Sequence, residues 1–164
     1  MPLYVRPALA DDWPFVYQLV RELLYDQLAA RLWDSAIPGL LDLQVRTKLA
    51  AYASAYPRAD HGIIMLDEAA VGRLLVDRSR EYHRLVDITI APRHRSAGIG
   101  TRLVLGLCME AELMGKSLRL NVSVTNPRAA ALYRRLGFRV IEDLETDWLM
   151  ERSPGSVAQV VAAP

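Results

Sequence analysis

The stretch RSAGIGT, residues 95–101, decides the fold, because it joins a predicted strand to a predicted helix through a glycine-rich turn. The free N–H groups in the first turn of a helix attract an anion, and glycine lets a phosphate approach the backbone closely. Arg93 and Arg95 can add charge-assisted hydrogen bonds. The turn predicts a pyrophosphate site, although two glycines alone fit equally well with a tight turn that binds nothing.

Two commoner phosphate motifs are excluded by their spacing. A Rossmann fingerprint needs a third small residue three places after Gly100, where this chain has Leu103. The letters GKS at residues 115–117 resemble the end of a Walker motif, but that motif needs a glycine five residues earlier, where Glu110 stands. Its lysine would also open a helix, whereas this lysine follows a predicted helix end.

The segments on either side of the turn alternate between strand and helix periodicity. Upstream, a strand at residues 3–6 precedes a helix capped by Asp11 or Asp12, which ends before residues 38–39. The other predicted helices span residues 42–56, 98–114 and 126–136, and the other strands span residues 62–66, 71–77, 85–90, 118–122, 138–141 and 147–151, with a four-residue turn at 67–70. We expect Ala53 and Met114 to face the core. This order predicts an α/β protein with a mixed, mostly antiparallel central sheet of about seven strands and helices on both faces.

A second segment, NPRAAALYRRLGF at residues 126–138, is more specific than the turn. Asn126 can cap a helix whose first position is Pro127, and Gly137 lies just past its end. With RSAGIG at residues 95–100, this segment resembles the GNAT N-acetyltransferase superfamily. Its hallmarks are Gln/Arg-x-x-Gly-x-Gly/Ala and, one strand later, an Asn-capped helix with Leu-Tyr and a Leu-Gly-Phe ending. The resemblance covers roughly residues 86–151 and implies a GNAT-like fold.

The resemblance also implies a co-substrate, acetyl-CoA, and no metal. It implies that the cofactor-binding residues are Ile88, Thr89, Ile90, Arg95, Ser96, Ala97, Gly98, Ile99, Gly100, Thr101 and Asn126. In such a site, the strand at residues 88–90 pairs with the pantetheine arm, and the turn holds the pyrophosphate. Tyr133 is implied as the catalytic acid that protonates the departing thiolate, which fits a phenol of pKa about 10 and a thiol of pKa about 8.5.

An amine acceptor also needs a base, and here the chain departs from one GNAT subset. Protein N-terminal acetyltransferases of the ribosomal type often have a glutamate in the strand before the Asn-capped helix. This chain has Asn121 there, which cannot act as a base. Asp87, beside the cofactor strand, and Glu81, in the preceding loop, are the candidates, and a water chain is a third alternative. Each carboxylate is more often an ordinary solvated or paired group.

The remaining reactive side chains carry no pattern of their own. His61, His83 and His94 are scattered singly, without cysteines or carboxylates at metal-ligand spacing, and are expected on the surface. Cys108 lies within a predicted helix without an assigned base, which indicates a structural thiol.

Composition restricts the partners and the compartment. The 164 residues carry a net charge of +1, which calls for neither a nucleic acid nor a membrane as partner. One cysteine, and the lack of an apolar leader at the N-terminus, predict a cytoplasmic protein. We expect one domain at residues 1–152 and a flexible tail at residues 153–164, and a homodimer is left open.

Two functions follow as hypotheses. The first is an enzyme that moves an acetyl group from acetyl-CoA directly to a primary amine of a small molecule or peptide. The second is a non-catalytic acyl-CoA-binding regulatory domain of the same fold. Tyr133 favours the enzyme, and the lack of an obvious base leaves room for the second hypothesis. The acceptor amine is not identified by any motif.

Overall fold

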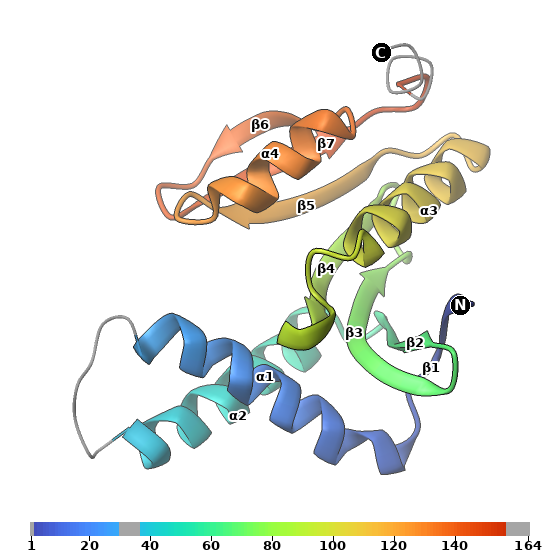
Figure 1. Cartoon of the computed structure of the whole chain (residues 1–164). Coiled ribbons are helices and arrows are strands. Elements are labelled where there is room, and N and C mark those ends of the chain that lie inside the picture. Colours follow the sequence, from blue (N-terminus) through green and yellow to red (C-terminus); the bar gives the residue numbers. More distant parts are fainter. Residues whose placement is uncertain (1, 30–36, 157–164) are drawn as a thin grey trace. The chain divides into compact units, whose positions relative to one another are not determined.

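The computed structural model describes residues 2–29 and 37–156, which form a mixed α/β fold with a seven-stranded, mostly antiparallel sheet flanked by helices (Figure 1). The strand order is β1-β2-β3-β4-β5-β7-β6. The strands are β1 (Leu3–Pro7), β2 (Asp60–Leu66), β3 (Ala69–Asp77), β4 (His83–Ile90), β5 (Leu118–Ser123), β6 (Arg139–Asp143) and β7 (Asp147–Arg152). The helices are η1 (Ala10–Asp12), α1 (Trp13–Ala29), α2 (Ile37–Ala55), η2 (Pro92–His94), α3 (Ile99–Leu113) and α4 (Pro127–Arg135), where η marks a 3-10 helix. The predicted fold class is confirmed.

The chain forms two compact units. The first contains Met1–Leu75 and Asp87–Ala97, and the second contains Val76–Val86 and Gly98–Pro164. Strands β3 and β4 therefore each contribute residues to both units. The single domain proposed for residues 1–152 stays a prediction.

The first unit is built on the edge strands and the first two helices. β1 pairs antiparallel with β2, from Leu3 opposite Leu66 to Pro7 opposite Gly62. α1 and α2 lie side by side in Figure 1. Their shared apolar cluster contains Val20, Leu24, Leu41 and Val45. A second cluster joins Val16 of α1 to Ile63 and Met65 of β2. This apolar packing holds α2 in the first unit.

The second unit is built around β5. β7 pairs antiparallel with both β5 and β6, and α3 and α4 pack against β5. On its other side, β5 pairs in parallel with β4, where His83–Leu85 lie opposite Leu118–Leu120. The parallel step predicted between these two strands is confirmed.

Two helix starts differ from the predictions. Asp12 does not cap α1, because its carboxylate accepts hydrogen bonds from the Arg6 guanidinium and the Leu9 N–H, all at 2.7 Å, and so closes η1. α2 begins at Ile37, five residues before the predicted start at 42. Proline is tolerated in a first helical turn, because the N–H that it lacks would have no partner there.

Two inward-facing assignments and one turn were also wrong. Ala53 is exposed, and Tyr52 beside it is half-buried, so the inner face of α2 runs through Val45 and Tyr52. Met114 is 61% exposed, because α3 has already ended at residue 113. The turn before β3 has two residues, Asp67 and Glu68, in place of the four predicted.

The predicted tail, residues 153–164, is described by the structure only as far as residue 156. Residues 153–156 form a turn, in which the Gly155 N–H donates to the Glu112 carboxylate of α3 at 2.6 Å. The rest of the predicted tail, residues 157–164, lies outside the described residues. Among the helices that the structure describes, none combines the length and the apolar character of a membrane span.

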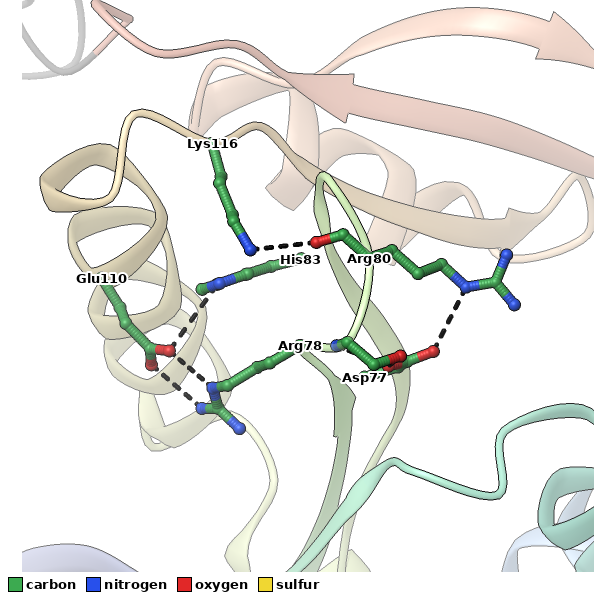
Figure 2. Close-up of polar contacts among 7 residues, drawn as sticks. Asp77, Arg78, Arg80, His83, Glu110 and Lys116 are labelled. Atoms are coloured by element: carbon green, nitrogen blue, oxygen red, sulfur yellow. Dashed lines mark hydrogen bonds and ion pairs between the residues drawn. The ribbon is translucent and has the colours of Figure 1, made fainter.

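A polar cluster ties the β3–β4 loop to α3 and to the segment that follows it (Figure 2). The Arg78 guanidinium makes a two-point ion pair with Glu110, at 2.5 and 2.9 Å. The Lys116 ammonium donates to the Arg80 carbonyl at 2.9 Å. Asp77 accepts hydrogen bonds from the Ser79 N–H and hydroxyl, which closes the loop on itself. The β3–β4 loop is therefore held at several points.

His83 lies inside this cluster and not on the surface as predicted. It is the first residue of β4 and is fully buried, and its Nδ1 lies 3.6 Å from a Glu110 oxygen. Neither ring nitrogen has a hydrogen-bond partner among the described residues. Burial lowers the pKa of His83; Glu110 raises it, and Lys116 and Arg78 lower it further. The ring is therefore kept neutral.

Replacing His83 with leucine is expected to remove part of the acid sensitivity of the fold. The unfolded chain binds a proton near the ordinary histidine pKa of about 6.5, whereas folded His83 binds it only at lower pH. Wild-type stability therefore falls as the pH drops below that ordinary value, and His83→Leu lacks this loss. The variant also lacks buried unpartnered nitrogens, which cost about 1–3 kcal/mol each. Urea unfolding at pH 5 and pH 7.5 measures both effects.

His94→Leu is the matched control, because His94 is half-exposed and lies outside the cluster. It should keep the wild-type pH dependence. If His83→Leu kept that dependence as well, the acid sensitivity would have another origin.

Candidate active site

The glycine-rich turn leads directly into the bare N-terminus of a fifteen-residue helix. Ser96 and Gly98 have positive φ angles of 67° and 74°, so the backbone is tightly wound before α3 begins. Arg102 is the first residue of the helix whose N–H donates to Gly98, which leaves the N–H groups of Ile99–Thr101 without helical partners. Gly98 supplies no side-chain cap. These donors and the positive end of the helix dipole suit an anion.

Arg95 fixes the start of this turn within the first unit. Its Nε donates to the Ile90 carbonyl at 2.9 Å, and its NH1 lies 3.3 Å from an Asp26 oxygen on α1. The predicted cofactor-binding arginine thus links the end of β4 to α1.

β4 presents two chemically different faces. Ile88 and Ile90 are half-buried on one face, and Asp87 and Thr89 alternate with them on the other. The Thr89 hydroxyl lies 3.2 and 3.4 Å from the two Asp87 oxygens. The parallel pairing with β5 covers only His83–Leu85, so the predicted pantetheine strand lies beyond it.

The second predicted motif forms α4 as expected. The Asn126 side chain accepts a hydrogen bond from the Ala129 N–H at 3.1 Å, Pro127 follows it, and Gly137 has a φ of 90° just past the end. Tyr133 is 8% exposed, and its ring lies 5.7 Å from the Phe138 ring in an edge-on contact. The predicted acid therefore sits on the inner face of α4.

The predicted site residues divide between the two units. Ile88–Ile90 and Arg95–Ala97 belong to the first unit, and Gly98–Thr101, Asn126 and Tyr133 belong to the second. Chain continuity brings the two halves of the turn together at residues 97 and 98. The cofactor roles of these residues stay predictions.

The two candidate bases differ sharply in their surroundings. Glu81 is exposed in the β3–β4 loop. Asp87 has 11% of its side-chain surface exposed and lies 3.7 Å from NH1 of Arg73, which is 2% exposed. Burial raises the pKa of Asp87, which makes it a stronger base than an ordinary aspartate. Asn121, which the sequence excluded as a base, is exposed and accepts a hydrogen bond from Arg84 at 2.7 Å.

Sequence reasoning missed the partners of Asp87. Arg73 comes from β3, and Tyr52 and Lys48 come from α2. The signal was a single arginine within the apolar stretch VGRLLV and a single aspartate within LVDITI, because a charge inside a buried strand needs a partner. The described residues contain no group of three or more His, Cys, Asp or Glu side chains able to hold a metal ion.

Comparison with known proteins gives one family and several similar structures. A sequence model described as the acetyltransferase (GNAT) family matches residues 4–138. The PaiA N-acetyltransferase of Thermoplasma acidophilum, solved in complex with coenzyme A, has a TM-score of 0.72 at 17% identity, over 93% of this chain and 99% of that chain.

Two further solved structures are named for different acceptors. The ribosomal-protein-S18-alanine N-acetyltransferase of Escherichia coli has a TM-score of 0.64 at 19% identity, over 93% of this chain and 94% of that one. A spermidine N-acetyltransferase chimera of Vibrio cholerae SpeG and hSSAT has a TM-score of 0.66 at 18% identity, over 99% and 100%. At these identities, the likeness concerns the fold.

Proposed function

Because the chain belongs to the GNAT acetyltransferase family, we propose that it transfers an acetyl group from acetyl-CoA directly to a primary amine. The observation that carries the proposal is the N-terminus of α3, where Gly98 winds the turn and three backbone N–H groups lack helical partners. A pyrophosphate fits such donors. The structure in complex with coenzyme A among the similar folds supports the same co-substrate.

In this proposal the chain supplies a base, a binding strand and an acid. Asp87 accepts a proton from the ammonium form of the acceptor, and the freed amine lone pair forms the new C–N bond. The backbone of Ile88–Ile90 aligns the thioester arm by hydrogen bonds. As the C–S bond breaks, the Tyr133 hydroxyl gives its proton to the departing thiolate. The new amide nitrogen loses its second proton, which restores the Tyr133 hydroxyl. No covalent bond to the protein forms, and acetyl-CoA supplies the acyl group.

The acceptor is proposed as a small-molecule or peptide amine. The similar structures are named for a protein alanine and for spermidine, so the shared fold accommodates acceptors of very different size. Calorimetry with acetyl-CoA, followed by a thiol-release assay over polyamines, amino acids, aminoglycosides and peptides, tests the proposal. Binding with turnover of at least one amine is expected. Binding without turnover on any of them would favour the non-catalytic acyl-CoA-binding domain.

The pyrophosphate position is tested by an isosteric pair, Gly98→Asn and Gly98→Asp. Both residues tolerate the positive φ of 74°, and a Cβ atom at Gly98 would meet no heavy atom within 4 Å. Only the aspartate adds a negative charge where the phosphates are expected. We expect Gly98→Asp to bind CoA at least about tenfold more weakly than Gly98→Asn, by calorimetry, at similar melting temperatures. Equal affinities would place the pyrophosphate elsewhere.

Tyr133→Phe is expected to lower kcat while leaving acetyl-CoA affinity unchanged. The ring and its contact with Phe138 remain, and only the hydroxyl is lost. A proton donated in the transition state contributes on the order of 10²–10⁴ in rate, and a thiolate is a good leaving group, so the lower part of that range applies. Steady-state kinetics should show equal falls in kcat and kcat/KM. An unchanged kcat where chemistry limits turnover would reduce Tyr133 to a packing residue.

Asp87→Asn is expected to lower kcat/KM by on the order of 10²–10⁴, because the amide cannot accept the ammonium proton. The acid limb of the wild-type pH profile, set by the raised pKa of Asp87, should disappear with it. Glu81→Gln is the control and should leave the profile unchanged. Because Arg73 loses its counter-charge, folding is checked by the melting temperature and by CoA affinity. A folded Asp87→Asn variant of normal activity would eliminate Asp87 as the base.

A further inference from the structure

A cluster of polar side chains from three elements of the first unit surrounds the Asp87 carboxylate. Arg73 comes from β3, and Thr89 comes from β4 itself. From α2, Lys48 acts on the Asp87 charge, and the Tyr52 hydroxyl makes a hydrogen bond with the carboxylate. A charged group inside an apolar sheet is costly unless several partners compensate it. Each partner therefore affects how readily Asp87 stays ionised.

The four partner side chains act on the pKa of Asp87 in the direction opposite to that of burial. Burial raises the pKa of Asp87, and the charges of Arg73 and Lys48 and the hydrogen bonds of Thr89 and Tyr52 lower it. Burial and the charge of Arg73 both lower the pKa of His61 on β2. The basicity of Asp87 thus results from burial on one side and these contacts on the other.

Unlike the other partners, Tyr52 makes contacts through its aromatic ring as well as through its hydroxyl. The Arg73 guanidinium carbon lies 5.5 Å and the Lys48 ammonium 5.6 Å from the ring centre, both within cation–π range. Burial and the Asp87 charge raise the pKa of Tyr52, so its hydroxyl keeps its proton and remains a donor. The ring is therefore held beside the same two cations that act on the Asp87 carboxylate.

We propose that Tyr52 is a positioning residue, which orients the Asp87 carboxylate and keeps it ionised for accepting the proton of the acceptor amine. This inference rests on the proposed function. Arg73 is a buried counter-ion, since it is 2% exposed and its NH1 lies 3.7 Å from an Asp87 oxygen. Tyr52 and Lys48 are only half-buried on α2, in contrast to Arg73. Tyr52→Phe removes only the hydroxyl and keeps the ring beside the two cations, so it changes the surroundings of Asp87 with little change in packing.

The first experiment tests the contact between Tyr52 and Asp87 independently of catalysis. Full-length protein labelled with ¹³C at aspartate side-chain carboxyls is titrated by NMR, and the Asp87 signal is assigned by its loss in Asp87→Asn. Tyr52→Phe removes one hydrogen bond to the charged carboxylate, so the Asp87 midpoint should rise by on the order of one pH unit. Lys48→Gln should raise the midpoint as well, because it removes a positive charge that lowers the pKa of Asp87. Tyr4→Phe is the matched control, because Tyr4 is 45% exposed on β1, and should change nothing.

Kinetics with the best amine of the acceptor panel complete the test. In Tyr52→Phe the acid limb of kcat/KM should move to higher pH by the same amount as the NMR midpoint, with acetyl-CoA affinity unchanged. An unmoved NMR midpoint in a folded Tyr52→Phe variant would overturn the inference whether or not the protein is an enzyme. A moved midpoint with an unmoved acid limb would overturn the role of Asp87 as base, and with it the role of Tyr52. If the protein turned over no amine, the proposed enzyme function would be wrong. The NMR titration would still show whether Tyr52 acts on Asp87.

Discussion

The neighbouring strands β3 and β4 are the constraint on which the rest of the structure depends, because each contributes residues to both compact units. In each of these strands, the residues at one end pack within one unit and the residues at the other end pack within the other unit. Toward the loop, Asp77 and His83 belong to the polar cluster that ties the β3–β4 loop to α3. Toward the other end, Arg73 and Asp87 form an ion pair among the helices and strands of the first unit.

The buried ion pair connects stability with the proposed chemistry. Replacing a buried pair by apolar residues is often neutral or stabilising, so a pair of this kind is weak support for a purely structural role. Here the carboxylate keeps 11% of its surface exposed while its arginine partner keeps 2%. The Asp87 carboxylate is therefore partly open to solvent while the Arg73 guanidinium is buried. The proposed base needs such an accessible carboxylate beside a buried counter-ion. The same compensation by Tyr52 and Lys48 prevents the raised pKa of Asp87 from rising further.

The glycine-rich turn depends on backbone conformation more than on side chains. Gly98 has a positive φ, and its open surroundings leave room for a ligand. Arg95, expected from its position to contact phosphate, is engaged by the Ile90 carbonyl and Asp26. Through Arg95, the start of the turn is thus bonded to the end of β4 and to α1. An arginine at this point of the motif therefore contributes by placing the turn, in addition to any direct contact with phosphate.

The sequence by itself determined the features that depend on near neighbours in the chain. Helical and strand periodicity, the Asn126 cap and the glycine just past the end of α4 follow from residues within a few positions of one another, and with the two motifs they identified the fold class. Only the tertiary structure decided that His83 is buried and that Asp87 meets Tyr52. These contacts join residues 27–35 positions apart, from His83 to Glu110 and from Tyr52 to Asp87. Periodicity shows which side of an element is apolar, but the partner across the gap depends on how whole elements pack and on their register.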